Sequence, residues 1–126
     1  MKRASSSTPS ARTNGAIWPD DQGRHINAHG GGVLFHDGVY YWYGEHKIAG
    51  DAGNVAHVGV HVYASRDLLS WRDSGIALAV SDDPRSEIAA GCVIERPKVV
   101  YNRLTRTFVM WFHLELKGQG YLASRS

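Results

Sequence analysis

Two glutamates and one histidine are the side chains in this sequence whose type and setting best suit chemistry. Glu45 and Glu95 each lie in an aromatic or apolar stretch that is typical of a β-strand. A carboxylate in such a setting can give or take a proton, or bind a ligand through hydrogen bonds. His29 precedes three glycines, residues 30–32, which let a ligand approach the backbone closely. These three side chains are therefore the first candidates for a functional site.

Each candidate also has a structural interpretation that the sequence leaves open. Glu45 could be a surface residue at the end of a strand. Glu95 could form only an ion pair with Arg96 or Lys98, and His29 could be a core histidine whose nitrogens bond to the backbone. The residue types alone do not decide between these roles.

Other titratable residues are less suggestive. His57 and His61 fall on one face of a predicted strand, but no third ligand has a recognisable spacing, so the sequence predicts no metal site. No cofactor is expected. His113 and Glu115 share the face of another strand and are assigned no chemistry. Cys92 is the only cysteine, which excludes an internal disulfide, and its apolar neighbours favour a plain buried thiol.

The elements that must position these residues are predicted to be β-strands. Residues 33–35 and 39–44 flank an Asp-Gly pair, a strong signal for a hairpin. Two further strands are expected at 58–63 and around 75–80. The pattern then starts again, with a hairpin formed by 97–101 and 108–116. In its second arm, Phe108, Met110, Phe112, Leu114 and Leu116 alternate with residues facing the other way.

Length and composition bound the possible functions. The chain has 126 residues, of which 43% are hydrophobic and 21% charged, as in a folded protein. The net charge is +2 and no Lys/Arg cluster stands out, so nucleic acid is not an expected partner. No apolar run is long enough to cross a membrane, and no signal peptide is visible. Residues 1–16 are expected to be a disordered lead-in.

Several motifs resemble glycoside hydrolase family 43. Ser-Arg-Asp-Leu-Leu-Ser-Trp at 65–71 resembles a turn of five-bladed propeller glycosidases, in which Asp and Ser cap the turn and Trp packs between strands. Four segments resemble the branch of the family that includes exo-β-1,3-galactanases: 26–32, 40–47, 94–99 and 109–113. The resemblance runs from about Trp18 to the last residue.

This resemblance implies an all-β fold, a five-bladed β-propeller, of which the chain supplies about two blades. We expect residues 17–126 to be a partial propeller, with blade 1 at about 26–80 and an incomplete blade 2 at about 92–126. Two blades leave strand edges open, because a propeller needs more blades to close, so the chain is interpreted as an N-terminal fragment.

The resemblance also implies an inverting mechanism with a carboxylic acid and a base on opposite faces of the sugar ring. The family's usual first-blade Asp is missing near His29, and Arg-Pro-Lys-Val at 96–99 replaces the usual Ala-Pro-Asp-Val. Glu95 is expected to supply the second-blade carboxylate instead. Both departures are features of the galactanase-like branch. The general acid would lie beyond residue 126, so the chain alone is expected to be inactive.

The expected function is release of terminal galactose from β-1,3-galactan, with an oligo- or polysaccharide as partner. Glu95 is predicted to be catalytic, and His29, Glu45, Trp42 and Trp111 to bind the substrate. The two tryptophans offer flat faces for sugar stacking, or alternatively pack between sheets. The alternatives are an α-L-arabinofuranosidase or β-xylosidase, a non-catalytic carbohydrate-binding propeller, and a truncated, inactive product. The whole enzyme is expected to be extracellular or periplasmic.

Overall fold

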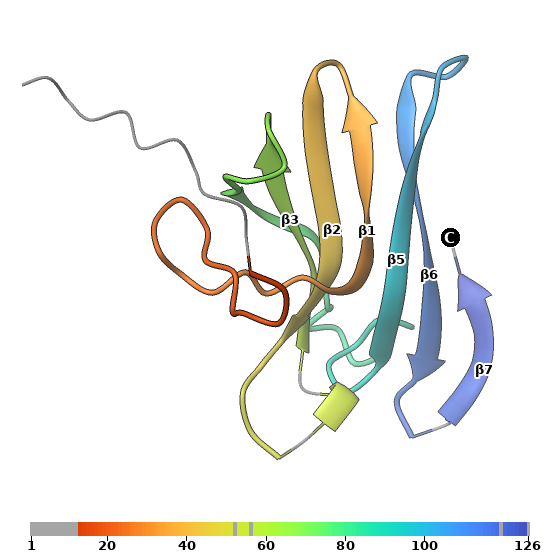
Figure 1. Ribbon diagram of the computed structural model, residues 1–126. Coiled ribbons are helices and arrows are strands. Elements are labelled where there is room, and N and C mark those ends of the chain that lie inside the picture. The colour runs from red at the N-terminus through yellow and green to blue at the C-terminus, as the bar shows by residue number, and fades with distance from the viewer. Residues whose placement is uncertain (1–12, 52, 56, 119, 126) are drawn as a thin grey trace, which may run out of the picture.

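The computed structural model describes residues 13–51, 53–55, 57–118 and 120–125, which fold into two antiparallel sheets (Figure 1). The first sheet has four strands in the order β1 (His29–His36), β2 (Val39–Lys47), β3 (His57–Ser65) and β4 (Arg72–Ala79). A 3₁₀ turn, η1 (Gly53–Val55), lies between β2 and β3. Residues 1–12 of the expected lead-in lie outside the described residues.

The second sheet has three strands in the order β5 (Val93–Asn102), β6 (Thr107–Leu116) and β7 (Gly120–Arg125). Both predicted hairpins are present. The β1–β2 turn uses Asp37 and Gly38, both at positive φ, which is the backbone that a tight two-residue hairpin requires. In the β5–β6 turn, the Asn102 side-chain oxygen accepts hydrogen bonds from the backbone N–H groups of Leu104 and Thr105.

Two strands begin earlier than the sequence predicts. β1 starts at His29 and β5 at Val93, four residues before the predicted starts at 33 and 97. The extra residues hold irregular register, between His29 and Gly32 in β1 and between Glu95 and Lys98 in β5. Pro97 lies within the β5 irregularity, where its missing N–H removes no ladder hydrogen bond.

The two sheets pack face to face, with β1 of the first sheet beside β5 of the second (Figure 1). Their shared core consists of buried Val60, Cys92, Ile94 and Leu114. Met110, Phe112 and Leu116 pack against this core, so the predicted alternation of β6 is confirmed for the residues nearest the core. Burial raises the pKa of the Cys92 thiol, which agrees with the expected inert role.

The other face of the first sheet is covered by the segment that precedes β1. Ile26 and Ala28 pack there with Tyr63 and Trp71 in a second core. The Tyr63 hydroxyl accepts a hydrogen bond from the backbone N–H of Asn27 at 3.0 Å. This anchors the chain immediately before His29, where β1 begins.

The turn at 65–71 has the architecture that its motif predicts. The Asp67 carboxylate accepts hydrogen bonds from the backbone N–H groups of Leu69 and Ser70, both at 2.8 Å. The Ser65 hydroxyl accepts one from Leu68, and Trp71 is buried in the second core. Among the described residues, no helix is long and apolar enough to cross a membrane.

Candidate functional site

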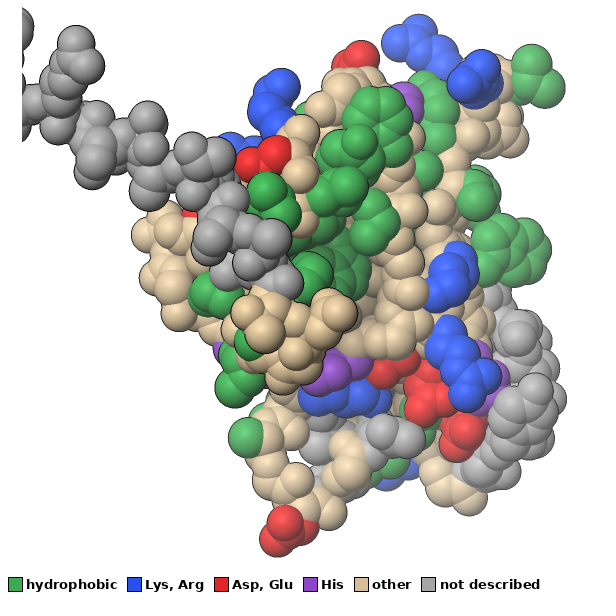
Figure 2. Space-filling model, viewed as in Figure 1, with side chains coloured by type: hydrophobic (Ala, Val, Ile, Leu, Met, Phe, Trp, Pro, Cys, Tyr) green, Lys and Arg blue, Asp and Glu red, His purple; other side chains and the backbone are tan. Residues whose placement is uncertain are grey.

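The candidate residues gather where β1 and β5 begin. Both strands have irregular register there, and Arg96 in β5 adopts a left-handed backbone conformation with φ of 52°. Such a conformation is uncommon for a side chain other than glycine and is often found at functional sites. Figure 2 shows acidic, basic and histidine side chains gathered over this end of the two strands.

Glu45 on β2 is the most enclosed of the predicted site residues, with 5% of its surface exposed. Its Oε1 accepts a hydrogen bond from the backbone N–H of Arg96 at 2.7 Å, and its Oε2 lies 3.2 Å from the Lys47 ammonium. A Cβ atom added to Gly30 would lie 2.9 Å from Oε1, so only glycine leaves room for this carboxylate. The interpretation of Glu45 as a surface residue does not hold.

Lys98 of β5 forms a second link between the two sheets, to the backbone of β1. Its ammonium donates hydrogen bonds to the carbonyl oxygens of Gly31 at 2.5 Å and of Gly30 at 3.3 Å. At Gly32 the Lys98 side chain takes the space that a β1 side chain would fill, so this glycine lets the β1 backbone lie close to β5. Glu95 forms no ion pair with Lys98 or Arg96 within the described part of the chain.

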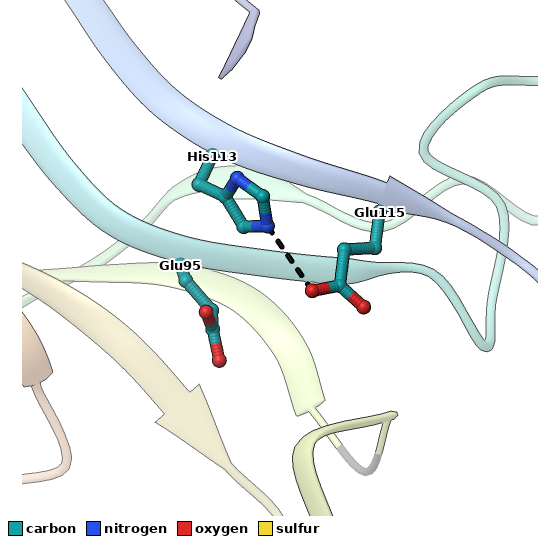
Figure 3. Close-up of side chains that lie close together, drawn as sticks. All are labelled: Glu95, His113 and Glu115. Carbon is teal, nitrogen blue, oxygen red and sulfur yellow. Dashed lines mark hydrogen bonds and ion pairs between the residues drawn. The ribbon is translucent and has the colours of Figure 1, made fainter. Parts of the chain in front are cut away.

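Glu95 instead lies beside His113 and Glu115 of β6 (Figure 3). One ligating atom from each of the three side chains lies within 4.8 Å of the other two, and all three residues are half-buried. His113 Nε2 is 3.1 Å from Glu115 Oε1, at hydrogen-bond distance. The sequence assigned no chemistry to His113 or Glu115, although their alternation on β6 already places them on one face.

The remaining predicted residues lie outside the group formed by Glu95, His113 and Glu115. His29 is exposed and is the register partner of Glu45. Trp111 is 54% exposed and is the register partner of Lys98, on the face of the second sheet that also carries Glu95. Trp42 lies on the opposite face of β2 from Glu45, because the two residues are an odd number of positions apart.

Trp42 packs in the second core rather than beside the carboxylates. Its ring makes edge contacts with Trp18 at 6.0 Å and with Trp71 at 5.3 Å between ring centroids. Tyr63 lies against it as well. This arrangement matches the packing role that the sequence offered as the alternative for Trp42.

A histidine pair lies next to Glu45, on the opposite face of the sheet. His46 Nδ1 is 2.8 Å from His61 Nδ1, and His61 Nε2 is 2.6 Å from Asp73 Oδ1. Burial, together with His61 and His29, lowers the pKa of His46, and Asp73 only partly opposes this effect. His61 thus has two side-chain partners, and it belongs to no cluster of three metal-ligating residues among those described. The side chain of His57 lies outside the described residues.

Comparison with solved structures places this arrangement in a known family. A family 43 β-1,3-galactosidase, solved with galactodeoxynojirimycin, is 57% identical over 85% of this chain, with a TM-score of 0.81. The chain belongs to glycoside hydrolase family 43. The chain therefore forms part of the family's five-bladed β-propeller, and its two sheets correspond to about two blades.

Two other family 43 relatives extend the comparison. An exo-β-1,3-galactanase from Phanerochaete chrysosporium, solved with galactose, is 37% identical over 84% of this chain, with a TM-score of 0.73. One from Clostridium thermocellum is 36% identical over 88%, with a TM-score of 0.68. The chain spans 30%, 24% and 26% of the lengths of these three proteins. No protein-family model and no curated protein sequence matches it.

Proposed function

We propose that the whole protein containing this chain is an inverting glycoside hydrolase that releases terminal galactose from β-1,3-galactan, as found in arabinogalactan-type polysaccharides. The observation that carries this proposal is the 57% identity, over 85% of the chain, to a β-1,3-galactosidase. Two exo-β-1,3-galactanases with TM-scores of 0.73 and 0.68 support the same substrate class. Such a polysaccharide substrate favours an extracellular or periplasmic enzyme.

In this proposal Glu95 is the catalytic carboxylate that the chain contributes. It lies on β5, the strand beside β1, is half-buried, and has no hydrogen bond or ion pair within the described part of the chain. A carboxylate that makes no such contact with the described residues can bind a sugar hydroxyl or a water molecule without first breaking one of them. Inverting hydrolysis needs a second carboxyl group across the sugar ring, which we assign to a later blade.

Of the residues predicted to bind the substrate, His29 and Trp111 are exposed, whereas Glu45 and Trp42 pack against other parts of the chain. His29 is exposed at the start of β1, and Trp111 is exposed opposite Lys98, in the middle of β5; we assign both to contact with a bound sugar. Glu45 holds the Arg96 backbone, so its contribution is to fix the strand that carries Glu95 as well as to accept sugar hydroxyls. Trp42 is the weakest member, since its ring packs against Trp18 and Trp71.

The test is hydrolysis of β-1,3-galactobiose by the whole protein and by its Glu95→Gln variant. Arabinofuranosyl and xylosyl substrates serve as controls for the sugar. We expect galactose release, a loss of roughly a hundredfold or more in the variant, and no turnover by the 126-residue chain alone. Hydrolysis of only the arabinofuranosyl or xylosyl substrate would assign a different sugar. No turnover of any substrate, with retained galactobiose binding, would leave a carbohydrate-binding propeller.

A further inference from the structure

Three metal-ligating side chains meet on the face of the second sheet that lies away from the shared core. Glu95 of β5 is the register partner of His113 of β6, and Glu115 follows two residues later on the same face. Figure 3 shows the three side chains close together on two neighbouring strands, with His113 and Glu115 pointing toward each other and Glu95 beside them. The regular pairs Val93 with Glu115 and Glu95 with His113 hold the three positions next to each other, at the start of β5, before its register becomes irregular.

The distances suit a small ion. Zinc binds imidazole nitrogen and carboxylate oxygen at about 2.0–2.2 Å, so ligand atoms around a tetrahedral ion lie about 3.4 Å apart. His113 Nε2 and Glu115 Oε1 already lie 3.1 Å apart. One ligand atom from each of the three side chains lies within 4.8 Å of the other two, and rotation of the flexible glutamate side chains can bring them closer.

The local charge also favours a cation. Two half-buried carboxylates within 4.8 Å repel each other. Lys98 donates to the carbonyl oxygens of β1 and Lys47 pairs with Glu45, and neither forms an ion pair with Glu95 or Glu115 among the described residues. A bound divalent ion would neutralise both carboxylates and replace the hydrogen bond between His113 and Glu115.

We infer that Glu95, His113 and Glu115 form a binding site for Zn²⁺. One nitrogen and two oxygen ligands suit a borderline ion such as Zn²⁺ better than Ca²⁺, which takes six to eight oxygens. Three protein ligands leave the fourth tetrahedral position open to water or to a hydroxyl group of a ligand.

Zinc at this site has a consequence for hydrolysis that rests on the proposed function. If Glu95 is the carboxylate that contacts the sugar, an ion bound to it removes it from the reaction. Zinc is therefore an inhibitor of this enzyme, and zinc and substrate compete for the same side chain.

The first experiment measures zinc binding in the absence of any sugar. The chelator-treated chain is titrated with Zn²⁺ by calorimetry, and with Co²⁺ by its visible absorption, which reports tetrahedral coordination. Glu115→Gln and His113→Gln remove one ligand each with little change in size. His25→Gln is the matched control, since His25 is an exposed histidine outside the cluster.

We expect one ion per chain, bound at least tenfold more weakly by both cluster variants and equally well by the control. The His113 ring resonances in an NMR spectrum should shift on zinc addition, which verifies that this imidazole is a ligand in the folded wild-type chain. Absence of binding, binding that the cluster variants retain, or unmoved His113 resonances would overturn the site.

The second experiment separates this inference from the proposed function. Hydrolysis of β-1,3-galactobiose by the whole protein is measured with chelator and then with saturating Zn²⁺. Zinc binding without any hydrolysis in chelator would reject the proposed function and keep the metal site. Hydrolysis that saturating zinc leaves unchanged would reject the competition at Glu95.

Discussion

The Glu45 carboxylate of β2 accepts a hydrogen bond from the backbone N–H of Arg96 in β5, at 2.7 Å and across 51 residues of sequence. This bond joins the two sheets at the point where β5 departs from regular pairing. Arg96 has a positive φ there, so its N–H points out of the ladder and toward β2. The position of Glu95 thus depends on a residue of the other sheet.

Glu45→Leu is expected to destabilise the chain because it leaves the Arg96 N–H without its acceptor and removes the ion pair between Glu45 and Lys47. Hydrogen bonds to a charged group contribute about 1.5–3 kcal/mol, so we expect a loss of that size in the free energy of unfolding. Urea denaturation followed by fluorescence measures it. Asp82→Asn is the control, since Asp82 is exposed. Equal stability of the two variants would show that the bond between the sheets contributes nothing.

Gly31 and Gly32 provide a matched pair for the close approach between β1 and its neighbours. A Cβ at Gly31 would lie 1.6 Å from the Tyr43 carbonyl oxygen, whereas one at Gly32 would meet only the flexible Lys98 side chain at 3.3 Å. We expect Gly31→Ala to cost about 3 kcal/mol or more, because backbone must move, and Gly32→Ala to cost about 1 kcal/mol or less. Thermal or urea unfolding of the two variants compares them directly, and a Gly31→Ala as stable as Gly32→Ala would contradict the geometry.

The His46–His61 pair makes stability depend on pH. Burial and the neighbouring histidines hold the pKa of His46 below its ordinary value of 6.5, so the unfolded chain binds a proton that the folded chain resists. The contribution of this group is therefore complete above that value and declines as pH falls below it. Asp73 acts in a lower range, because its lowered pKa contributes stability above 3.8 that is lost in stronger acid.

Urea unfolding at about pH 7.5 and about pH 5.0 measures this dependence. We expect the wild-type chain to be less stable at the lower pH, and His46→Gln to show a smaller difference between the two. His25→Gln, which changes an exposed histidine, should keep the wild-type difference. A His46→Gln chain with an undiminished pH dependence would assign the effect to other groups.

Local signals predicted the hairpins, and tertiary contacts decided what the sequence missed. The Asp37-Gly38 turn and the alternation of β6 depend on residues that are neighbours in the sequence, so both could be predicted without knowledge of the tertiary structure. The early starts of β1 and β5 could not, because glycine and proline normally end a strand. They continue here because Lys98 and Glu45 supply hydrogen bonds from another strand or the other sheet.

The same distinction holds for the site. Glu45 and Glu95 stood out as carboxylates in apolar strands, but the sequence does not show how their environments differ. Glu45 is buried and has two partners, whereas Glu95 is half-buried and has none among the described residues. His113 and Glu115 were set aside because strand alternation alone does not show which face meets another functional residue. Their significance follows from the register that pairs His113 with Glu95.

Trp111 and Trp42 test whether exposure or packing decides which aromatic ring binds sugar. Trp111 is 54% exposed, so Trp111→Ala should change the free energy of unfolding by no more than about 0.5 kcal/mol. Trp42 packs in an aromatic core, so Trp42→Ala should cost about 3–5 kcal/mol.

Binding of β-1,3-galactobiose to the whole protein, measured by calorimetry, then assigns the sugar platform. If Trp111 stacks on the sugar, Trp111→Ala should bind roughly two- to tenfold more weakly while remaining folded, because aromatic stacking contributes about 0.5–1.5 kcal/mol beyond buried area. Trp111→Phe keeps an aromatic face and should recover part of the affinity. Unchanged affinity in the alanine variant would show that Trp111 does not contact the sugar, and its exposed ring would then be free for packing against another blade.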